Sequence, residues 1–259
     1  MLRIGVVTAV AMAFLMLGQL MPGQLMHGPA ILASEAEDTR TALNLAKLIQ
    51  AARSVISANQ DLINDPDIGD KGLTGDVVLA AALERFKQST EIDPMSVDAD
   101  SREGRLLGAG MEAIREVTDE HQDFINREGV GFKAFIPAVF GRLITERLGE
   151  KVGDLAEIKI TAPPHLVRNR KARPDAWELE VIEQKLATAE WPRGEIFAES
   201  FESKGRDAFR VAVPEYYSAS CLSCHGEPKG EIDITGYPKE GAQEGDLGGV
   251  ISITLFHTE

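Results

Sequence analysis

Apolar residues in the first half of the chain recur at steps of three and four, the pattern of helices with one buried face. The longest such run covers residues 39–63 and is followed by Pro66, which cannot continue a helix. After a loop with three glycines, Val78, Ala82 and Phe86 predict a shorter helix. We therefore expect a helical first half that opens with one long helix.

Two further helices follow the same pattern. Residues 102–127 predict a second long helix, which stops at Gly129 and Gly131. Residues 132–148 are again helical in pattern, so Pro137 must lie in the first turn of this helix or kink it.

The period of the pattern changes to two after Gly153. Ile158 and Ile160 alternate with charged neighbours, as in a strand with one buried face. Asp175 is placed to cap a short helix. Three more runs have the composition of strands, at residues 195–201, 208–213 and 250–256. A small antiparallel sheet covered by helices, an α+β fold, accommodates all of these elements.

The amino terminus has the outline of a secretory signal. Arg3 precedes an apolar run over residues 4–18. Small residues that suit signal peptidase follow, at Ala30, Ala33, Ser34 and Ala36. The apolar run is shorter than the roughly 20 residues that span a bilayer. We therefore expect a signal peptide over residues 1–33 and one periplasmic domain over residues 34–259, opening with a helix over residues 34–66. The alternative is an uncleaved segment that anchors the domain to the membrane.

Composition narrows the class of protein. Hydrophobic residues make up 44% of the 259 residues, which is enough to build a core. A formal net charge of -14 argues against nucleic-acid binding, which requires clustered Lys and Arg. The chain has no Gly-x-Ser-x-Gly motif, and the glycines of residues 245–249 lack the lysine of a phosphate-binding loop. We therefore expect no enzymatic activity.

The only two cysteines stand in the pentapeptide Cys221-Leu222-Ser223-Cys224-His225. In an exported protein this spacing is typical of covalent haem attachment, in which two thiols add to the vinyl groups and the adjacent imidazole binds the iron. Two intervening residues let both sulfurs reach neighbouring vinyls of one macrocycle. The sequence therefore predicts one haem c, attached through Cys221 and Cys224, with His225 as an axial iron ligand.

Two other interpretations use the same residues. A disulfide or dithiol redox centre formed by Cys221 and Cys224 would be expected at a helix start in a thioredoxin-like βαβ unit, which the pattern does not predict. A zinc site would need a fourth ligand beside two thiolates and one imidazole. Both stay open as alternatives to haem.

Further candidates for cofactor binding lie outside the pentapeptide. A basic cluster in this acidic chain comprises Arg168, Arg170, Lys171 and Arg173. Because guanidinium groups suit carboxylates, we expect Arg168 and Arg170 to bind haem propionates; the alternative is a solvated loop with weak ion pairs. Tyr216 and Tyr217 precede the motif, and we expect Tyr217 to contact the porphyrin edge, with core packing as the alternative.

Three segments in series resemble one known family. They are TAPPHLVRNRKARPDAWE (Thr161 to Glu178), VPEYYSASCLSCHG (Val213 to Gly226) and GYPKEGAQEGDLGGVISITL (Gly236 to Leu255). They look like the periplasmic c-type haem domains with a PAS-like fold, a cyanobacterial-type haem sensor family catalogued as a domain of unknown function. The resemblance covers roughly the last two thirds of the chain. It implies a PAS-like sheet, a haem held by Cys221, Cys224 and His225, a sensory or redox role, and a site role for Arg168.

The chain departs from this family in one respect. The cyanobacterial member with a described site uses a further cysteine as the second axial ligand, but this chain has no third cysteine. The equivalent position falls near Phe132, which cannot bind iron. The sixth coordination site is therefore open or taken by another donor, and the candidates are Met95, Met111, His121, Lys133 and His165.

Whether the sixth coordination site of the iron is open or occupied distinguishes the candidate functions. A five-coordinate iron could bind a small gaseous ligand such as NO, CO or oxygen. It would suit a haem-based redox or gas sensor that acts through a separate signalling or redox partner by way of the long amino-terminal helix. A six-coordinate iron favours an electron-transfer cytochrome, whose acidic surface would dock basic redox partners. A haem-dependent enzyme such as a peroxidase is a third possibility.

Overall fold

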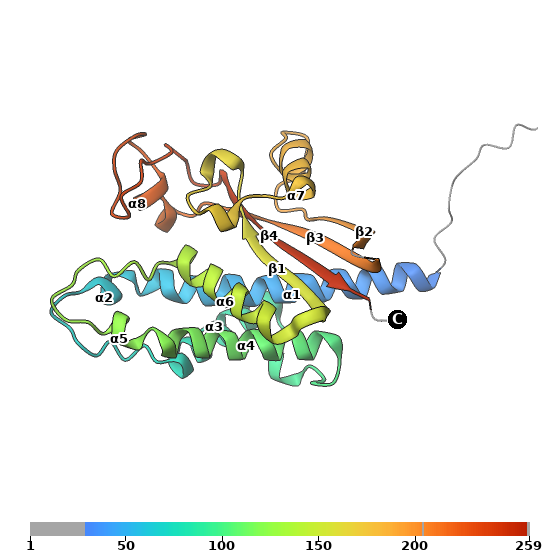
Figure 1. Cartoon of the computed structure of the whole chain (residues 1–259), viewed down its shortest axis with the longest axis horizontal. Helices are drawn as coiled ribbons and strands as arrows, with labels where there is room; N and C mark the ends of the chain where they lie inside the picture. Colours follow the sequence, from blue (N-terminus) through green and yellow to red (C-terminus); the bar gives the residue numbers. More distant parts are fainter. Residues whose placement is uncertain (1–28, 204, 258–259) are drawn as a thin grey trace, which may run out of the picture.

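The computed structural model describes residues 29–203 and 205–257, which form a helical layer against a four-stranded sheet (Figure 1). The sheet is antiparallel throughout, with strand order β1-β4-β3-β2. The expected α+β fold, with an antiparallel sheet, flanking helices and a long amino-terminal helix, is confirmed.

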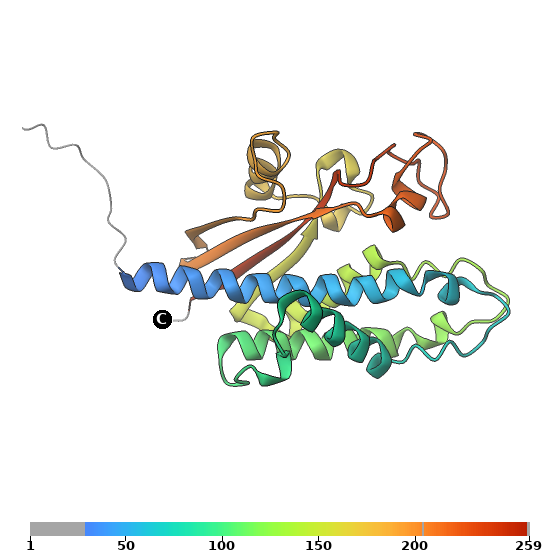
Figure 2. The same cartoon turned by 180° about the vertical axis from the view of Figure 1, so that it is seen from behind.

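The long amino-terminal helix α1 covers Pro29–Ala58, and the short helix α2 follows over Gln60–Asn64. One helix was expected where the structure has two. The break lies at Asn59, whose backbone leaves the helical region and whose side-chain amide donates to the carbonyl of Val55 at 2.8 Å. Asparagine disfavours helix interiors because its amide competes for backbone partners. Figure 2 shows α1 extending along the helical layer from the sheet to α2.

The second long helix is also interrupted. Helix α3 covers Gly75–Thr90, the 3-10 turn η1 covers Pro94–Ser96, and α4 covers Arg102–Glu120. At His121 the backbone is no longer helical, and the short helix α5 follows over Gln122–Ile125. The expectation of one helix over residues 102–127 is therefore wrong for residues 121–127, where the helix is interrupted and then ends.

Helix α6 covers Pro137–Val152 and begins five residues later than expected. Proline disfavours helical backbone in the residue before it, and Ile136 is accordingly extended, with φ -100° and ψ 161°. Pro137 occupies the first turn, as the sequence predicts. Three residues before Pro137, Ala134 has φ 52°, a conformation outside any right-handed helix.

The four strands are β1 (Ala156–Thr161), β2 (Phe197–Ser203), β3 (Arg206–Tyr216) and β4 (Leu247–Phe256). The turn η2 (Gly153–Leu155) leads from α6 into β1. Short helices lie in the connections between strands: η3 (Pro164–Leu166), η4 (Arg170–Ala172), α7 (Ala176–Val181) with a π-helical turn over Ile182–Leu186, η6 (Ala219–Cys221) and α8 (Leu222–His225). Asp175 caps α7 and forms a reciprocal capping box with Glu178, which confirms its expected role.

Side chains of the central strands β3 and β4 alternate between two buried clusters, one on each face of the sheet. Val211 and Ile253 lie in the larger core with α1, α4 and α6. Ala212 and Val250 face the opposite side and pack with Val181 and its neighbours from α7. The site described below lies at one end of this sheet.

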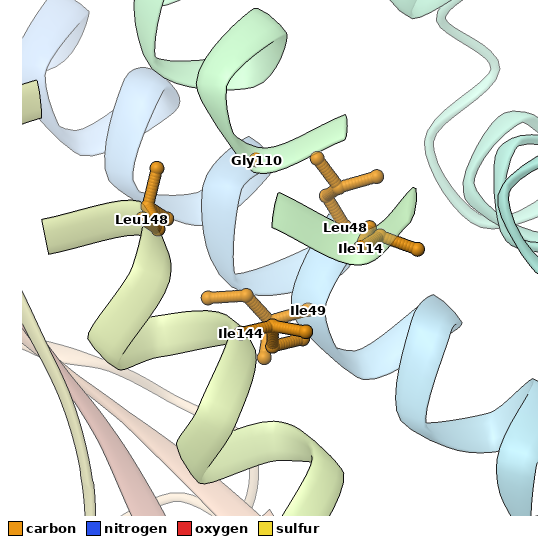
Figure 3. A pocket seen from close by; sticks show the side chains of 6 residues that line it. All are labelled: Leu48, Ile49, Gly110, Ile114, Ile144 and Leu148. Atoms are coloured by element: carbon orange, nitrogen blue, oxygen red, sulfur yellow. The ribbon is translucent and has the colours of Figure 1, made fainter. Parts of the chain in front are cut away.

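The helical layer is closely packed where α1, α4 and α6 meet, around a small recess lined only by apolar residues (Figure 3). Gly110 of α4 lies at this crossing, and a β-carbon there would stand 3.0 Å from Cδ2 of Leu48. Two helices approach this closely because the glycine has no side chain.

The expected signal segment, residues 1–33, lies outside the described residues except for its last five, which begin α1. Among residues 29–203 and 205–257, no helix combines the length and apolar character needed to cross a bilayer.

The crossing at Gly110 yields a matched test. Gly110→Val should lower the free energy of unfolding by about 1–3 kcal/mol, because the added methyl groups have no room between α1 and α4. Gly108→Val in the same helix should change it by less than about 0.5 kcal/mol, since nothing lies within 4 Å of its β-carbon position. Chemical denaturation of both variants measures these changes in the free energy of unfolding. Equal changes in the two variants would show that close packing at Gly110 does not limit which side chain fits there.

Candidate functional site

The pentapeptide that contains both cysteines lies in the connection from β3 to β4. Cys221 ends η6, and residues 222–225 form the single turn α8. Residues three apart on a helical turn face the same side, so Cys221 and Cys224 are neighbours in space. Both thiols are free and half-buried. Two sulfurs on one side of one turn fit attachment to neighbouring points of a single macrocycle.

The residue after the motif must be a glycine for the turn to close. Gly226 is buried, and its amide donates to the carbonyl of Leu222 at 2.9 Å. A β-carbon at Gly226 would stand 2.6 Å from that same carbonyl oxygen. The chain therefore leaves α8 by a path that only glycine fits.

The imidazole of His225 is held by two side chains. Its Nδ1 lies 2.8 Å from Oε2 of Glu240 and 3.2 Å from the hydroxyl of Tyr217. The ring also stacks on Tyr217, with centroids 4.7 Å apart and planes 24° apart. The other ring nitrogen, Nε2, makes no hydrogen bond to the residues that the structure describes. One imidazole nitrogen is therefore fixed and the other is available as a donor to iron.

Arg168 connects the motif to the loop that precedes β4. Its Nε and Nη2 donate to Oε1 and Oε2 of Glu240 at 2.9 and 3.0 Å, and its Nη1 donates to Oδ2 of Asp233 at 2.7 Å. Its Nη2 also donates to the carbonyl of Cys224 at 2.9 Å. One guanidinium thus holds two carboxylates and the backbone of the cysteine motif.

The pKa shifts follow from this arrangement. Burial would raise the pKa of Asp233, but hydrogen bonds from Thr235, Arg168 and nearby backbone amides hold it well below its usual range. Burial acts in the same direction on Glu240, but the hydrogen bonds from Arg168 and His225 keep its pKa below normal. Both carboxylates are therefore ionised at neutral pH.

Burial has the opposite consequence for the neutral acids of the site. It raises the pKa of Cys224, and burial together with the charge of Glu240 raises the pKa of Tyr217. The thiol and the phenol therefore stay protonated at neutral pH.

The two tyrosines before the motif have separate environments. Tyr217 is buried, exchanges backbone hydrogen bonds with Gly245 and Asp246, and covers Gly248, where a β-carbon would stand 2.6 Å from its ring. Tyr216 accepts a hydrogen bond from the amide of Gly194 instead. Only Tyr217 therefore belongs to the site, and its expected contact with a porphyrin stays a prediction.

The residues of the basic cluster also differ in their environments. Arg168 is the member that reaches the motif, whereas Arg170 is exposed and Lys171 forms an ion pair with Glu146 at 2.8 Å. Because Arg168 already binds two carboxylates of its own chain, its expected pairing with haem propionates stays a prediction, as does that of Arg170.

The five candidates for a sixth iron ligand are scattered over the structure. Met95 is 70% exposed in the connection from α3 to α4, at the opposite end of the helical layer from α2 and α5 (Figure 1). His165 is exposed in η3, and Met111 packs partly buried against the helical core. None of these three makes a hydrogen bond to the motif.

The two remaining candidates are engaged with backbone carbonyls. His121 Nδ1 lies 2.7 Å from the carbonyl of Val117. Lys133 is fully buried, and its amine donates to the carbonyls of Val130 and Asp65 at 2.7 and 3.2 Å. The identity of the sixth ligand is therefore still a matter of prediction. Among the residues with described positions, no group of three or more His, Cys, Asp or Glu side chains is placed to hold a metal ion.

The long helix α1 touches the site directly. Arg53 forms an ion pair with Glu215 at the end of β3, and its Nε donates to the carbonyl of Pro137 at 3.3 Å. One turn later, the hydroxyl of Ser57 donates to that of Ser220, next to the first cysteine, at 3.2 Å. A displacement of the motif would therefore reach α1 through these contacts.

Sequence reasoning missed Glu240, Asp233 and Arg53. Glu240 and Asp233 lie in a polar loop with several other carboxylates, and no periodicity distinguishes them. Proximity to the motif was the one available signal, because both follow it within twenty residues.

The sequence of the chain matches one known protein family. Residues 33–255 match the family profile described as Tll0287-like. No curated protein and no solved structure matches the chain.

The buried Asp233 predicts a pH-dependent stability. Its folded-state pKa lies below the value of about 3.9 expected in an unfolded chain, so the carboxylate stabilises the fold above that pH. This contribution is lost as the pH falls through the folded-state pKa. Asp233→Asn should therefore lower the free energy of unfolding by about 1.5–3 kcal/mol at pH 7, and the difference from the unmodified chain should shrink below about pH 4.

Denaturation at a series of pH values measures this difference. The exposed Asp207 in β3 supplies the control, because Asp207→Asn removes the same charge without a buried ion pair. A difference for Asp233→Asn that stayed constant down to pH 2 would contradict the assignment.

Proposed function

The chain belongs to the Tll0287-like family, and from this premise we propose that it is an exported protein carrying one covalent haem c. The observation that supports the proposal is the donor set of α8. Two free thiols lie on one side of a helical turn, followed directly by an imidazole whose Nε2 is available. The proposed location is the periplasm, after removal of residues 1–33.

In this proposal each residue of the motif has a defined task. The thiols of Cys221 and Cys224 would each add across a vinyl group, with the sulfur bonding one carbon and its hydrogen passing to the other. Nε2 of His225 would bind the iron from one side. The haem itself would supply an iron centre that changes oxidation state and binds small ligands. Tyr217 supports the imidazole ring by stacking, and Gly226 permits the turn.

We further propose that the protein is a redox or gas sensor module acting through a separate partner. The contacts of α1 favour this role, because Arg53 and Ser57 join the helix to Glu215 and Ser220, which lie directly before the motif. A small displacement of the motif on ligand binding would change these contacts, and α1 would present the change to a partner. The proposal includes no enzymatic activity.

The second candidate function is that of an electron-transfer cytochrome. The net charge of -14 favours it, because an acidic surface docks transiently on basic redox partners. The two functions differ in what the iron must do: a gas sensor needs an exchangeable sixth ligand, and an electron carrier does not.

Covalent attachment is tested first. The full chain should be produced in a host that matures c-type cytochromes, denatured, and stained for haem on a gel. We expect a haem-positive band from the unmodified chain, and loss of the covalent haem in the double variant Cys221→Ala/Cys224→Ala. His225→Ala should abolish the native iron spectrum. Ser223→Ala, which changes an exposed residue inside the motif, should retain haem. An unmodified chain without retained porphyrin would refute the proposal.

The choice between sensor and electron carrier follows from ligand binding. If the protein senses a gas, the reduced holoprotein should bind CO, with a shift of its Soret band and a simple saturation curve. A six-coordinate low-spin spectrum that CO leaves unchanged would exclude gas sensing and favour electron transfer. Carbon monoxide titration of the reduced protein, monitored by absorbance, measures this.

A further inference from the structure

We propose that Glu240 is a positioning residue that sets the tautomer, the orientation and the electron density of the His225 imidazole. This inference rests on the proposed haem function and deepens it, since it names the residue that tunes the same centre. Three features of the structure support it. Glu240 contacts Nδ1 of His225, Glu240 is itself held in place by other residues, and the contact of Tyr217 with the same nitrogen is longer and uncharged.

The contact with Glu240 determines which nitrogen of His225 carries a proton. An ionised carboxylate can only accept hydrogen bonds, so the Nδ1 atom 2.8 Å from Oε2 must be the donor. In a neutral imidazole the lone pair then lies on Nε2, which has no other partner among the described residues. Glu240 thus selects the tautomer that can bind iron. Partners of this kind also raise the basicity of a ligating histidine.

Glu240 is held rigidly from its other side. Both of its carboxylate oxygens accept hydrogen bonds from Arg168, and Arg168 is fixed in turn by the fully buried carboxylate of Asp233. The remaining oxygen of Asp233 accepts hydrogen bonds from the backbone amides of Thr235 and Tyr237. A continuous chain of contacts therefore runs from Asp233 through Arg168 and Glu240 to His225.

The backbone on both sides of Glu240 is also fixed. Lys239 exchanges hydrogen bonds with the opposite side of the loop, through the amides of Lys239 and Gly230. The amide of Ala242 donates to the carbonyl of His225 at 2.8 Å. The carboxylate of Glu240 is therefore attached to a loop that is itself bonded to the motif, so it cannot move away from the imidazole independently.

Tyr217 is the competing partner for Nδ1. Its hydroxyl lies 3.2 Å away, which is longer than the Glu240 contact, and a phenol, whose ordinary pKa is about 10, carries no charge at neutral pH. Its main interaction with His225 is the stacked ring. Tyr217 therefore orients the ring plane, whereas the charge that acts on the imidazole comes from Glu240.

The consequence is a measurable change in reduction potential. A carboxylate that accepts a hydrogen bond from Nδ1 makes the imidazole a stronger electron donor at Nε2, and a stronger donor stabilises ferric over ferrous iron. Glu240→Gln keeps the shape and a hydrogen-bond acceptor but removes the charge. We expect this variant to retain covalent haem and to have a higher reduction potential than the unmodified holoprotein.

Two matched variants separate this effect from general changes. Glu244→Gln removes a charge from an exposed residue of the same loop and should leave the potential unchanged. Tyr217→Phe removes the hydroxyl but keeps the ring, and its shift should be smaller than that of Glu240→Gln. If Glu240→Gln yields no folded holoprotein, Glu240→Asp decides instead, because its shorter carboxylate should also raise the potential.

The measurement is a spectroelectrochemical titration of each purified holoprotein, with haem content determined on the same samples. A potential for Glu240→Gln equal to that of the unmodified protein would overturn the inference, as would an equal rise in Glu244→Gln. In either case the covalent haem would still be present, so the proposed function would stand. Absence of covalent haem from the unmodified protein would instead refute the proposed function.

Discussion

The ion pairs of the partly buried guanidinium of Arg168 are the interaction on which the rest of the site depends. Asp233 and Glu240 are two carboxylates with little exposure, and burial of either without a cation would be strongly unfavourable. Arg168 forms an ion pair with each of them and also donates to the carbonyl of Cys224. The loop before β4, the segment after β1 and the cysteine motif are therefore joined at one side chain.

The sheet brings the partners of Arg168 together. Thr161, the last residue of β1, pairs with Val250 near the start of β4, and Tyr216, the last residue of β3, pairs with Leu247. The segments that continue from these three strand ends therefore emerge at the same end of the sheet. They carry Arg168, the cysteine motif and the Asp233–Glu240 loop. Helix α1 packs beneath the same strands and reaches this end through Arg53, so the site and the longest helix share one structural frame (Figure 1).

Local chemistry explains where sequence patterns succeeded in predicting the fold. The capped start of α7, the Pro137 start of α6 and the alternation of β1 depend on neighbours in the chain, and all were predictable. The breaks at Asn59 and His121 were not. Both residues lie within apolar stripes that continue across them, and the stripe alone predicts an uninterrupted helix. Their side chains bond to backbone carbonyls four residues earlier, a detail that hydrophobic periodicity does not contain. The late start of α6 was missed because a proline permits either a kinked or a shortened helix.

The same division applies to the site. By itself, the sequence determined which reactive groups the motif carries: the order Cys221, Cys224, His225 needs only the spacing of one helical turn, which adjacent residues set. It also singled out Arg168 and Tyr217 as candidates by their proximity or resemblance. Only the tertiary structure decided that Glu240 and Asp233 belong with them, because a contact between residue 168 and residue 240 depends on β1 pairing with β4. Short-range patterns carry the identity of reactive groups, whereas the charges that surround them come from segments that meet only after the sheet has formed.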